Sequence, residues 1–230
     1  MVSPLKQIIR IICAFVNWVV LLVCYLSLEY SASFIRVVYS AQKICGCEMM
    51  FDYKKCFDDY CSAHNLALHL SFSMPVGYET ANGNFDPACK TVFINAKRLK
   101  NESDSTKAFF LFHELRHALQ YLCPDQFSST IQRSIQYIIL YDGTCYKLTN
   151  ERYLKCQLDG GEEYFTDLYL SLPHEVDANT FAYKSVKKLY GDSEELKKLF
   201  NFWMPRHTIS DKTYDTIFLS IDEKTKEEPQ

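Results

Sequence analysis

A run of apolar residues from Ala108 to Leu122 carries a His-Glu-x-x-His sequence in the middle of this 230-residue chain. The run predicts a helix, because no glycine or proline interrupts it, Asp104 or Ser105 can cap its start and Pro124 ends it. Phenylalanine, leucine and alanine side chains occur on almost every side of that helix. A helix that is apolar nearly all round is buried, so we expect this one at the centre of the fold.

The two histidines of this run are four residues apart. A helix therefore places His113 and His117 on one face, where both imidazoles can bind the same metal ion. Glu114 follows directly, and its carboxylate can reach a water molecule on that metal without being a ligand. The alternative is a surface helix with two solvated histidines, but the apolar neighbours leave almost no polar face. Buried polar groups need partners, and a metal ion supplies one.

A third ligand is available in a second predicted helix, which begins at Pro173. Glu175 and Asn179 are four residues apart and share one face of that helix. Glu175 can therefore offer a metal-binding carboxylate, and one turn later Asn179 can orient a ligand histidine through its amide.

Together the two segments resemble the gluzincin peptidases, and most closely the ImmA/IrrE-like zinc peptidases of phages and mobile elements. The shared pattern is His113-Glu114-x-x-His117 followed by Glu175-x-x-Ala178-Asn179-x-Phe181-Ala182. The resemblance implies an α+β fold, namely a zincin-like domain with a small antiparallel sheet and an active-site helix. It also implies one Zn²⁺ ion bound by His113, His117 and Glu175, with Asn179 supporting a ligand. Glu114 is then the general base for peptide hydrolysis by a metal-activated water.

The predicted function is therefore a zinc-dependent peptidase that acts on a peptide or protein substrate. Its oxyanion needs a hydrogen-bond donor beside the metal, and the candidates are His174, His207, Tyr164 and Tyr169. Arg116 stands where the family usually has glycine. It can hold a substrate carboxylate or pair with an acid such as Asp177, and we favour the ion pair.

Two other functions remain open. One is a non-catalytic, zinc-stabilised binding module tethered to a membrane, whose site is closed by a fourth protein ligand such as His174. Glu114 argues against it, because a structural zinc site has no use for that carboxylate. The other is a membrane protein with an interaction role that merely carries the motif.

An apolar stretch at residues 11–28 is long enough to span a bilayer as a helix. We expect a single-pass anchor, with a cleaved signal peptide ending near Ser31-Ala32-Ser33 and a secreted product as one alternative. A buried core helix is the other. Basic residues are balanced on the two sides of the stretch, so we place the catalytic domain outside the cytoplasm on the evidence of the cysteines alone.

The chain has ten cysteines, eight of which follow the apolar stretch. An even number fits disulfide bonds in an oxidising compartment, while reduced thiols used as small core residues are the alternative. The net charge of −3 argues against nucleic acid as the main partner.

We divide the chain into an anchor and juxtamembrane segment (1–44), a zincin-like domain (45–205) with a β-rich insert (123–170), and a C-terminal tail (206–230). The insert carries a hairpin signal at Asp142-Gly143. A strand at 90–95 precedes the histidine helix. In the resembled family such a strand forms the sheet edge along which a substrate peptide is laid.

Overall fold

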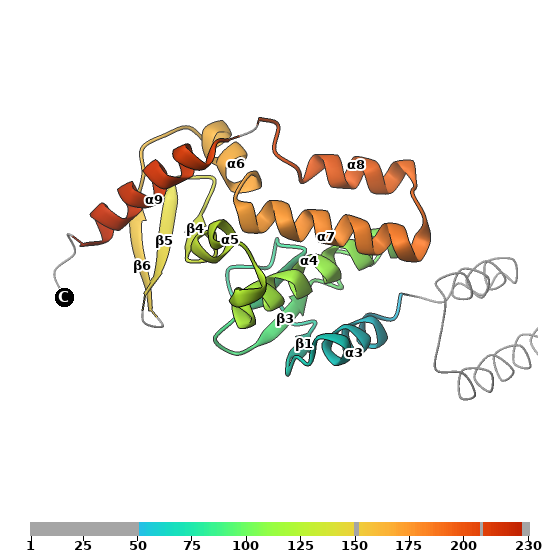
Figure 1. Cartoon of the computed structure of the whole chain (residues 1–230). Helices are drawn as coiled ribbons and strands as arrows, with labels where there is room; N and C mark the ends of the chain where they lie inside the picture. The colour runs from blue at the N-terminus through green and yellow to red at the C-terminus, as the bar shows by residue number, and fades with distance from the viewer. Residues whose placement is uncertain (1–50, 150–151, 208, 227–230) are drawn as a thin grey trace, which may run out of the picture. The chain divides into compact units, whose positions relative to one another are not determined.

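The computed structural model describes residues 51–149, 152–207 and 209–226. These residues form an α+β fold of seven α-helices, one short 3-10 helix and two three-stranded sheets (Figure 1). The chain divides into two compact units, and the unit described below comprises Phe51–Lys187 and Asp192–Gln230.

The first sheet contains β1 (His69–Ser71), β2 (Gly83–Asp86) and β3 (Thr91–Ile94) in the order β1-β3-β2. β1 is parallel to β3, and β2 is antiparallel to it, so this sheet is mixed rather than purely antiparallel. The expectation that the strand at 90–95 forms the sheet edge is wrong. β3 is central because it pairs with β1 on one side and β2 on the other, and its Val92 and Ile94 are fully buried. β2 is an edge strand that packs against α4 (Asp104–Leu122).

The histidine helix is α4 (Asp104–Leu122), and it packs against β2 and β3. Its N-cap is Ser103, one residue before the expected start, and the Ser103 hydroxyl accepts a hydrogen bond from the Thr106 backbone N–H. Twelve of its residues are buried, which confirms the expected central position. Helix α3 (Tyr53–His64) packs against α4, and α4 also contacts α8 (Glu194–Phe202).

The segment between the histidine helix and the helix that carries Glu175 contains the second sheet and is only partly β-rich. It comprises a 3-10 turn (Pro124–Gln126), α5 (Ser129–Ser134), the antiparallel strands β4 (Tyr137–Ile139), β5 (Thr144–Thr149) and β6 (Arg152–Gln157), and α6 (Glu162–Leu170). The hairpin expected at Asp142-Gly143 is present, with Gly143 at φ +82°. The last part of this segment is the helix α6. Acidic residues in its first turn favour a helix there, and Phe165 and Leu168 are buried on one of its faces.

The helix that carries Glu175 is α7 (Pro173–Tyr190), which is followed by Gly191 at φ +89°. The expected C-terminal tail is wrong for most of its length, because residues 211–226 form α9 (Asp211–Lys226). This helix packs on β5 and β6 and buries Tyr214, Ile217, Phe218 and Ile221 in a core shared with Phe165 and Leu168 (Figure 1). The tail was expected from the charged residues beyond Asp222, while the apolar face lies before them.

The membrane anchor expected at residues 11–28 lies outside the described residues. Among the residues that the structure does describe, no helix combines the length and apolar character needed to cross a bilayer.

Candidate metal centre

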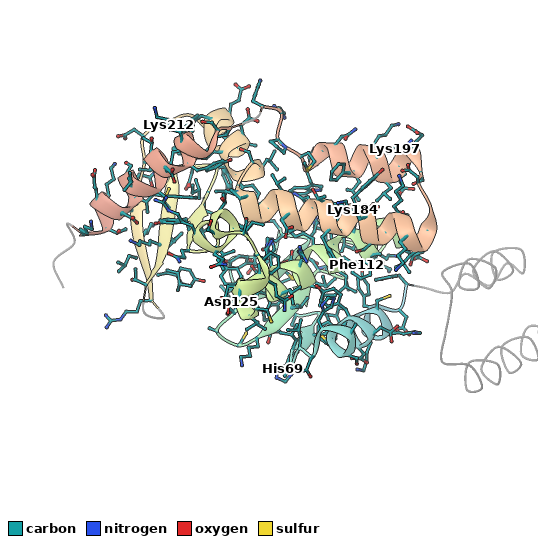
Figure 2. All side chains as sticks on the ribbon, in the orientation of Figure 1. His69, Phe112, Asp125, Lys184, Lys197 and Lys212 are labelled. Carbon is teal, nitrogen blue, oxygen red and sulfur yellow. The ribbon has the colours of Figure 1, made fainter. Side chains whose placement is uncertain are left out.

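The structure brings together the three residues expected to bind a metal. One ligand atom each from His113, His117 and Glu175 lies within 4.8 Å of the other two. The two histidine Nε2 atoms are 3.0 Å apart. Glu175 Oε2 is 3.4 Å from the Nε2 of His113, and Oε1 is 3.5 Å from that of His117. Helices α4 and α7 supply these side chains. Phe112 of α4 packs against Tyr60 of α3 and Phe181 of α7 (Figure 2).

These separations fit a zinc ion. A tetrahedral site with bonds of about 2.0–2.1 Å keeps its ligand atoms about 3.3 Å apart. Two imidazoles and one carboxylate are also a donor set that zinc accepts, and it leaves a coordination position free. Within the part of the chain that the structure describes, the group has three members, and His174 is not among them.

A residue that the sequence analysis missed fixes the orientation of His117. The Nδ1 atom of His117 is 2.8 Å from Gln120 Oε1, and Gln120 is completely buried. The signal was available in the sequence, because Gln120 follows His117 by three residues and therefore shares its helical face.

Asn179, expected to orient a ligand histidine, leaves one side-chain atom unpaired. Its Nδ2 donates a 2.8 Å hydrogen bond to the backbone carbonyl of Trp203, but its Oδ1 is buried without a partner. The Nδ1 atom of His113 is also buried without a partner. Asn179 Oδ1 is an acceptor, and His113 Nδ1 can carry a proton and donate. A hydrogen bond between these two atoms would satisfy both.

Glu114 is 7% exposed and lies against the edge strand β2. Gly83 of β2 approaches it so closely that a Cβ atom on Gly83 would be 2.7 Å from Glu114 Cγ. Burial raises the pKa of Glu114 above its ordinary value, while the two imidazoles and the backbone N–H of Phe85 partly offset the increase. The carboxyl group therefore sits where its basicity is increased, beside the proposed ligands.

The charges of the three proposed ligand residues strongly affect one another. Burial opposes ionisation of Glu175, but the imidazoles of His117 and His113 outweigh it and hold the pKa of that carboxyl well below its usual range. Burial also opposes protonation of His117, yet Glu175 and Glu114 raise its pKa to about 9. Without a metal, protonated His117 and ionised Glu175 thus form a charged pair. A metal ion bound by both residues would have to replace the proton on His117.

Of the four oxyanion candidates, Tyr169 and His174 lie beside this group. Burial, followed by the charges of Glu175 and Glu114, raises the pKa of Tyr169 well above its ordinary value, so its hydroxyl remains a donor. The Nε2 atom of His174 is 3.5 Å from Glu175 Oε1, and its Nδ1 is 2.6 Å from the Ser134 hydroxyl. Burial lowers the pKa of His174 to about 4, so this imidazole is neutral.

Arg116 forms the ion pair that we favoured over a substrate contact. Its Nε and one terminal nitrogen donate to the two Asp177 carboxylate oxygens at 2.7 and 3.0 Å. The rings of Phe127 and Phe181 lie 4.5 and 4.8 Å from the guanidinium carbon. This bidentate ion pair joins α4 to α7, and two aromatic rings pack against the guanidinium.

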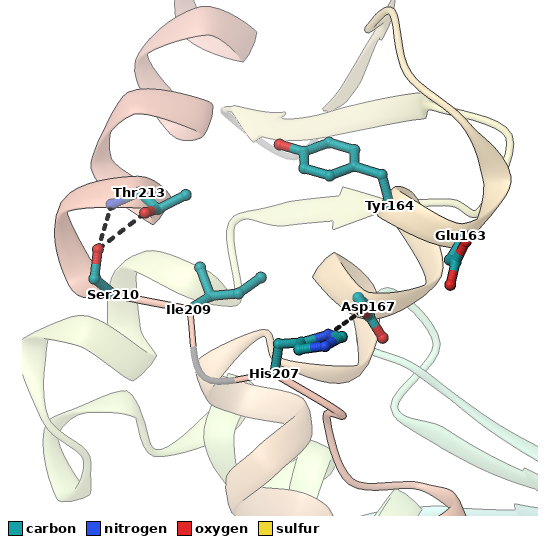
Figure 3. A pocket seen from close by; sticks show the side chains of 7 residues that line it. All are labelled: Glu163, Tyr164, Asp167, His207, Ile209, Ser210 and Thr213. Carbon is teal, nitrogen blue, oxygen red and sulfur yellow. Dashed lines mark hydrogen bonds and ion pairs between the residues drawn. The ribbon is translucent and has the colours of Figure 1, made fainter.

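His207 and Tyr164 lie in a different pocket, between α6 and the start of α9 (Figure 3). The pocket has a volume of about 620 Å³ and is lined by Glu163, Tyr164, Asp167, His207, Ile209, Ser210 and Thr213. His207 Nδ1 is 2.8 Å from Asp167 Oδ2, and most of the His207 side chain is exposed. The three proposed metal ligands do not line this pocket, so the structure does not support His207 or Tyr164 as an oxyanion donor.

Six cysteines lie among the described residues, and none of them forms a disulfide bond: Cys56, Cys61, Cys89, Cys123, Cys145 and Cys156. The disulfide bonds expected from the even count are therefore absent from this part of the chain. Cys145 is a fully buried core residue, as the alternative interpretation expected.

Comparison with known proteins adds no relative: no family model, no curated protein and no solved structure matches the chain.

Proposed function

We propose that this chain is a zinc-dependent peptidase with a zincin-like domain, tethered to a membrane by residues 11–28. The observation that carries the proposal is the convergence of His113, His117 and Glu175 with Glu114 held beside them. Residues 113 and 175 are far apart in sequence and come from two helices, so their meeting is a property of the fold. The order of elements agrees, since a small sheet precedes the histidine helix and the glutamate helix follows it.

His113, His117 and Glu175 would hold the metal. Bound there, zinc supplies a Lewis acid that polarises a carbonyl and lowers the pKa of water. Glu114 is not needed as a ligand, and its buried carboxylate accepts the proton of the attacking water and then passes it to the leaving nitrogen. Burial raises its pKa above the ordinary value, which makes the carboxylate a stronger base for the first step.

Tyr169 is the best candidate for stabilising the oxyanion. Its hydroxyl interacts with Glu175 and remains protonated, so it can donate a hydrogen bond to charge that develops on the carbonyl oxygen. His174 is the other candidate beside Glu175, and its two ring nitrogens face Ser134 and Glu175.

The edge strand β2 would bind the substrate backbone. One side of β2 pairs with β3, and its Gly83 lies directly against Glu114. An extended peptide that pairs with the free side of β2 would therefore pass the general base. This assigns to β2 the role that the sequence analysis gave to the strand at 90–95.

The experiment that tests the proposal compares wild type with Glu114→Gln. The full-length chain is assayed for zinc stoichiometry and for cleavage of a peptide library. We expect one zinc per chain in both, similar thermal stability, and a loss of hydrolysis of about 10²–10⁴-fold in the variant, because an amide cannot accept the proton. Loss of zinc in Glu114→Gln would make Glu114 a ligand. Zinc binding without any cleavage by wild type would favour the zinc-stabilised binding module.

A further inference from the structure

A network of hydrogen bonds connects the proposed ligand His117, through Gln120, to His174 and Asp177. Gln120 lies at the centre of this network. Its Nε2 donates to the backbone carbonyl of His174 at 2.9 Å and to Asp177 Oδ2 at 2.8 Å. Both partners can only accept, so the amide nitrogen must face them. The remaining atom, Gln120 Oε1, therefore faces His117 Nδ1 at 2.8 Å.

The fixed amide determines which nitrogen of His117 keeps its proton when the imidazole is neutral, as a metal ligand must be. A carbonyl oxygen can only accept, so Nδ1 of His117 must be the donor. The other nitrogen, Nε2, faces His113 Nε2 at 3.0 Å and Glu175 Oε1 at 3.5 Å. A metal-binding imidazole uses one nitrogen as the ligand and donates through the other, which is the arrangement found here.

Asp177 and Arg116 keep this amide in place. Asp177 Oδ2 accepts from both Gln120 and the Arg116 Nε, at 2.8 and 2.7 Å. The guanidinium donates to both Asp177 oxygens, and Asp177 Oδ2 is therefore held where it accepts from Gln120 as well. The rings of Phe127 and Phe181 hold the guanidinium in position.

We propose that Gln120, held by Asp177 and Arg116, is a positioning residue that sets the tautomer and ring orientation of His117 for metal binding. The inference rests on the proposed metal site. Arg116 replaces the usual glycine of the resembled family. The inference gives it the role of holding Asp177, which in turn holds Gln120 against His117.

The test compares Gln120→Leu with Gln120→Glu in the full-length chain. Leucine keeps the bulk but removes the acceptor, so zinc affinity measured against a competing chelator should fall about 10–100-fold. Glutamate keeps an acceptor for His117 Nδ1 but loses both donor bonds. It should therefore lose thermal stability, as leucine does, while holding zinc clearly more tightly than Gln120→Leu. Equal zinc affinities in the two variants would mean that Gln120 is only structural.

The control is Gln132→Leu. Gln132 also donates from its amide to a backbone carbonyl, that of Phe127, and lies in the neighbouring helix α5. This change should leave zinc affinity as in wild type. A loss as large as that of Gln120→Leu would show that any disturbance of this region weakens the site.

A spectroscopic measurement reports the hydrogen bond directly. In the zinc-loaded wild type, the His117 Nδ1–H signal in a ¹H–¹⁵N correlation spectrum should exchange slowly with solvent. Exchange should be faster in Gln120→Leu and remain slow in Gln120→Glu. Fast exchange in wild type would overturn the inference even if the variants fold poorly.

A double-mutant cycle tests the connection to Asp177. If Asp177 acts through Gln120, then Asp177→Ala and Gln120→Leu should weaken zinc binding by less together than the sum of their separate effects. Additive effects would exclude this connection. A chain that binds zinc but cleaves no peptide would refute the peptidase proposal and leave this inference standing, whereas a chain that binds no zinc would overturn both.

Discussion

Gly83 and Glu114 approach so closely that no larger residue fits at position 83 without movement. A Cβ atom on Gly83 would lie 2.7 Å from Glu114 Cγ and 2.8 Å from its Oε1. Gly83 begins the edge strand β2, and Glu114 follows the first proposed zinc ligand on α4. The glycine thus lets the strand that we propose for substrate binding touch the proposed general base.

We predict that Gly83→Ala impairs catalysis more than metal binding. The new methyl group must displace the Glu114 side chain, so kcat for peptide hydrolysis should fall about tenfold or more, the order of effect expected when a general base is misplaced. Zinc stoichiometry should be unchanged. Gly161→Ala is the matched control, because a Cβ there meets nothing within 4 Å. Unaltered kcat in Gly83→Ala would show that Glu114 is not held at this position during the reaction.

Zinc affinity should depend on pH through His117, whose pKa in the metal-free site is raised to about 9. A proton must leave this imidazole when the metal binds, so apparent affinity should rise up to about tenfold per pH unit below pH 9. Chelator competition between pH 6 and 9 measures this slope. A flat profile would contradict the coupling to Glu175.

The raised pKa of His117 should make the metal-free chain less stable as the pH rises. The folded-state pKa of His117 lies above the ordinary value of 6.5, so protonated His117 stabilises the fold fully below pH 6.5. That contribution is lost as the pH rises through about 9. Thermal melts of metal-free wild type should therefore show a decrease over this window that His117→Gln lacks.

Asn179 should have two separable roles. Asn179→Ala removes the hydrogen bond to the Trp203 carbonyl and the Oδ1 acceptor that we expect to orient a ligand histidine, so both stability and zinc affinity should fall, the latter about 10–100-fold. Asn179→Asp keeps an acceptor and loses the donor. It should therefore lose stability while retaining most of its zinc affinity. Equal affinities in the two variants would contradict a role for Asn179 in orienting His113.

Helix α9 should be necessary for stability. Phe218 is 2% exposed and stacks on Tyr137 with ring centroids 4.2 Å apart, so Phe218→Ala should cost about 3–5 kcal/mol of unfolding free energy. Its neighbour Leu219 is 54% exposed, and Leu219→Ala should change stability little. Chemical denaturation of both variants provides the measurement. Equal effects would indicate that α9 does not dock on the second sheet.

Local sequence was sufficient to predict α4, the shared face of His113 and His117, and the start of α7 at Pro173. These features depend on helical periodicity and on residues that begin or end helices, all within a few positions of each other. The convergence of Glu175 with the histidines was also anticipated, because a metal site needs another ligand and the pattern around Glu175 resembles a known family.

Tertiary structure alone decided the features that depend on residues distant in sequence. Strand order made β3 central and β2 the edge beside Glu114, although both strands are short and similar in character. Helix α9 packs on the second sheet because its apolar face meets β5 and β6, a match that no local pattern reveals. Gln120 could be placed near His117 from spacing, but its function depends on Asp177, 57 positions later. Hydrogen bonds of this kind are specified by how helices pack, so the sequence predicted the proposed ligands, while only the fold brought together the residues that we propose to orient them.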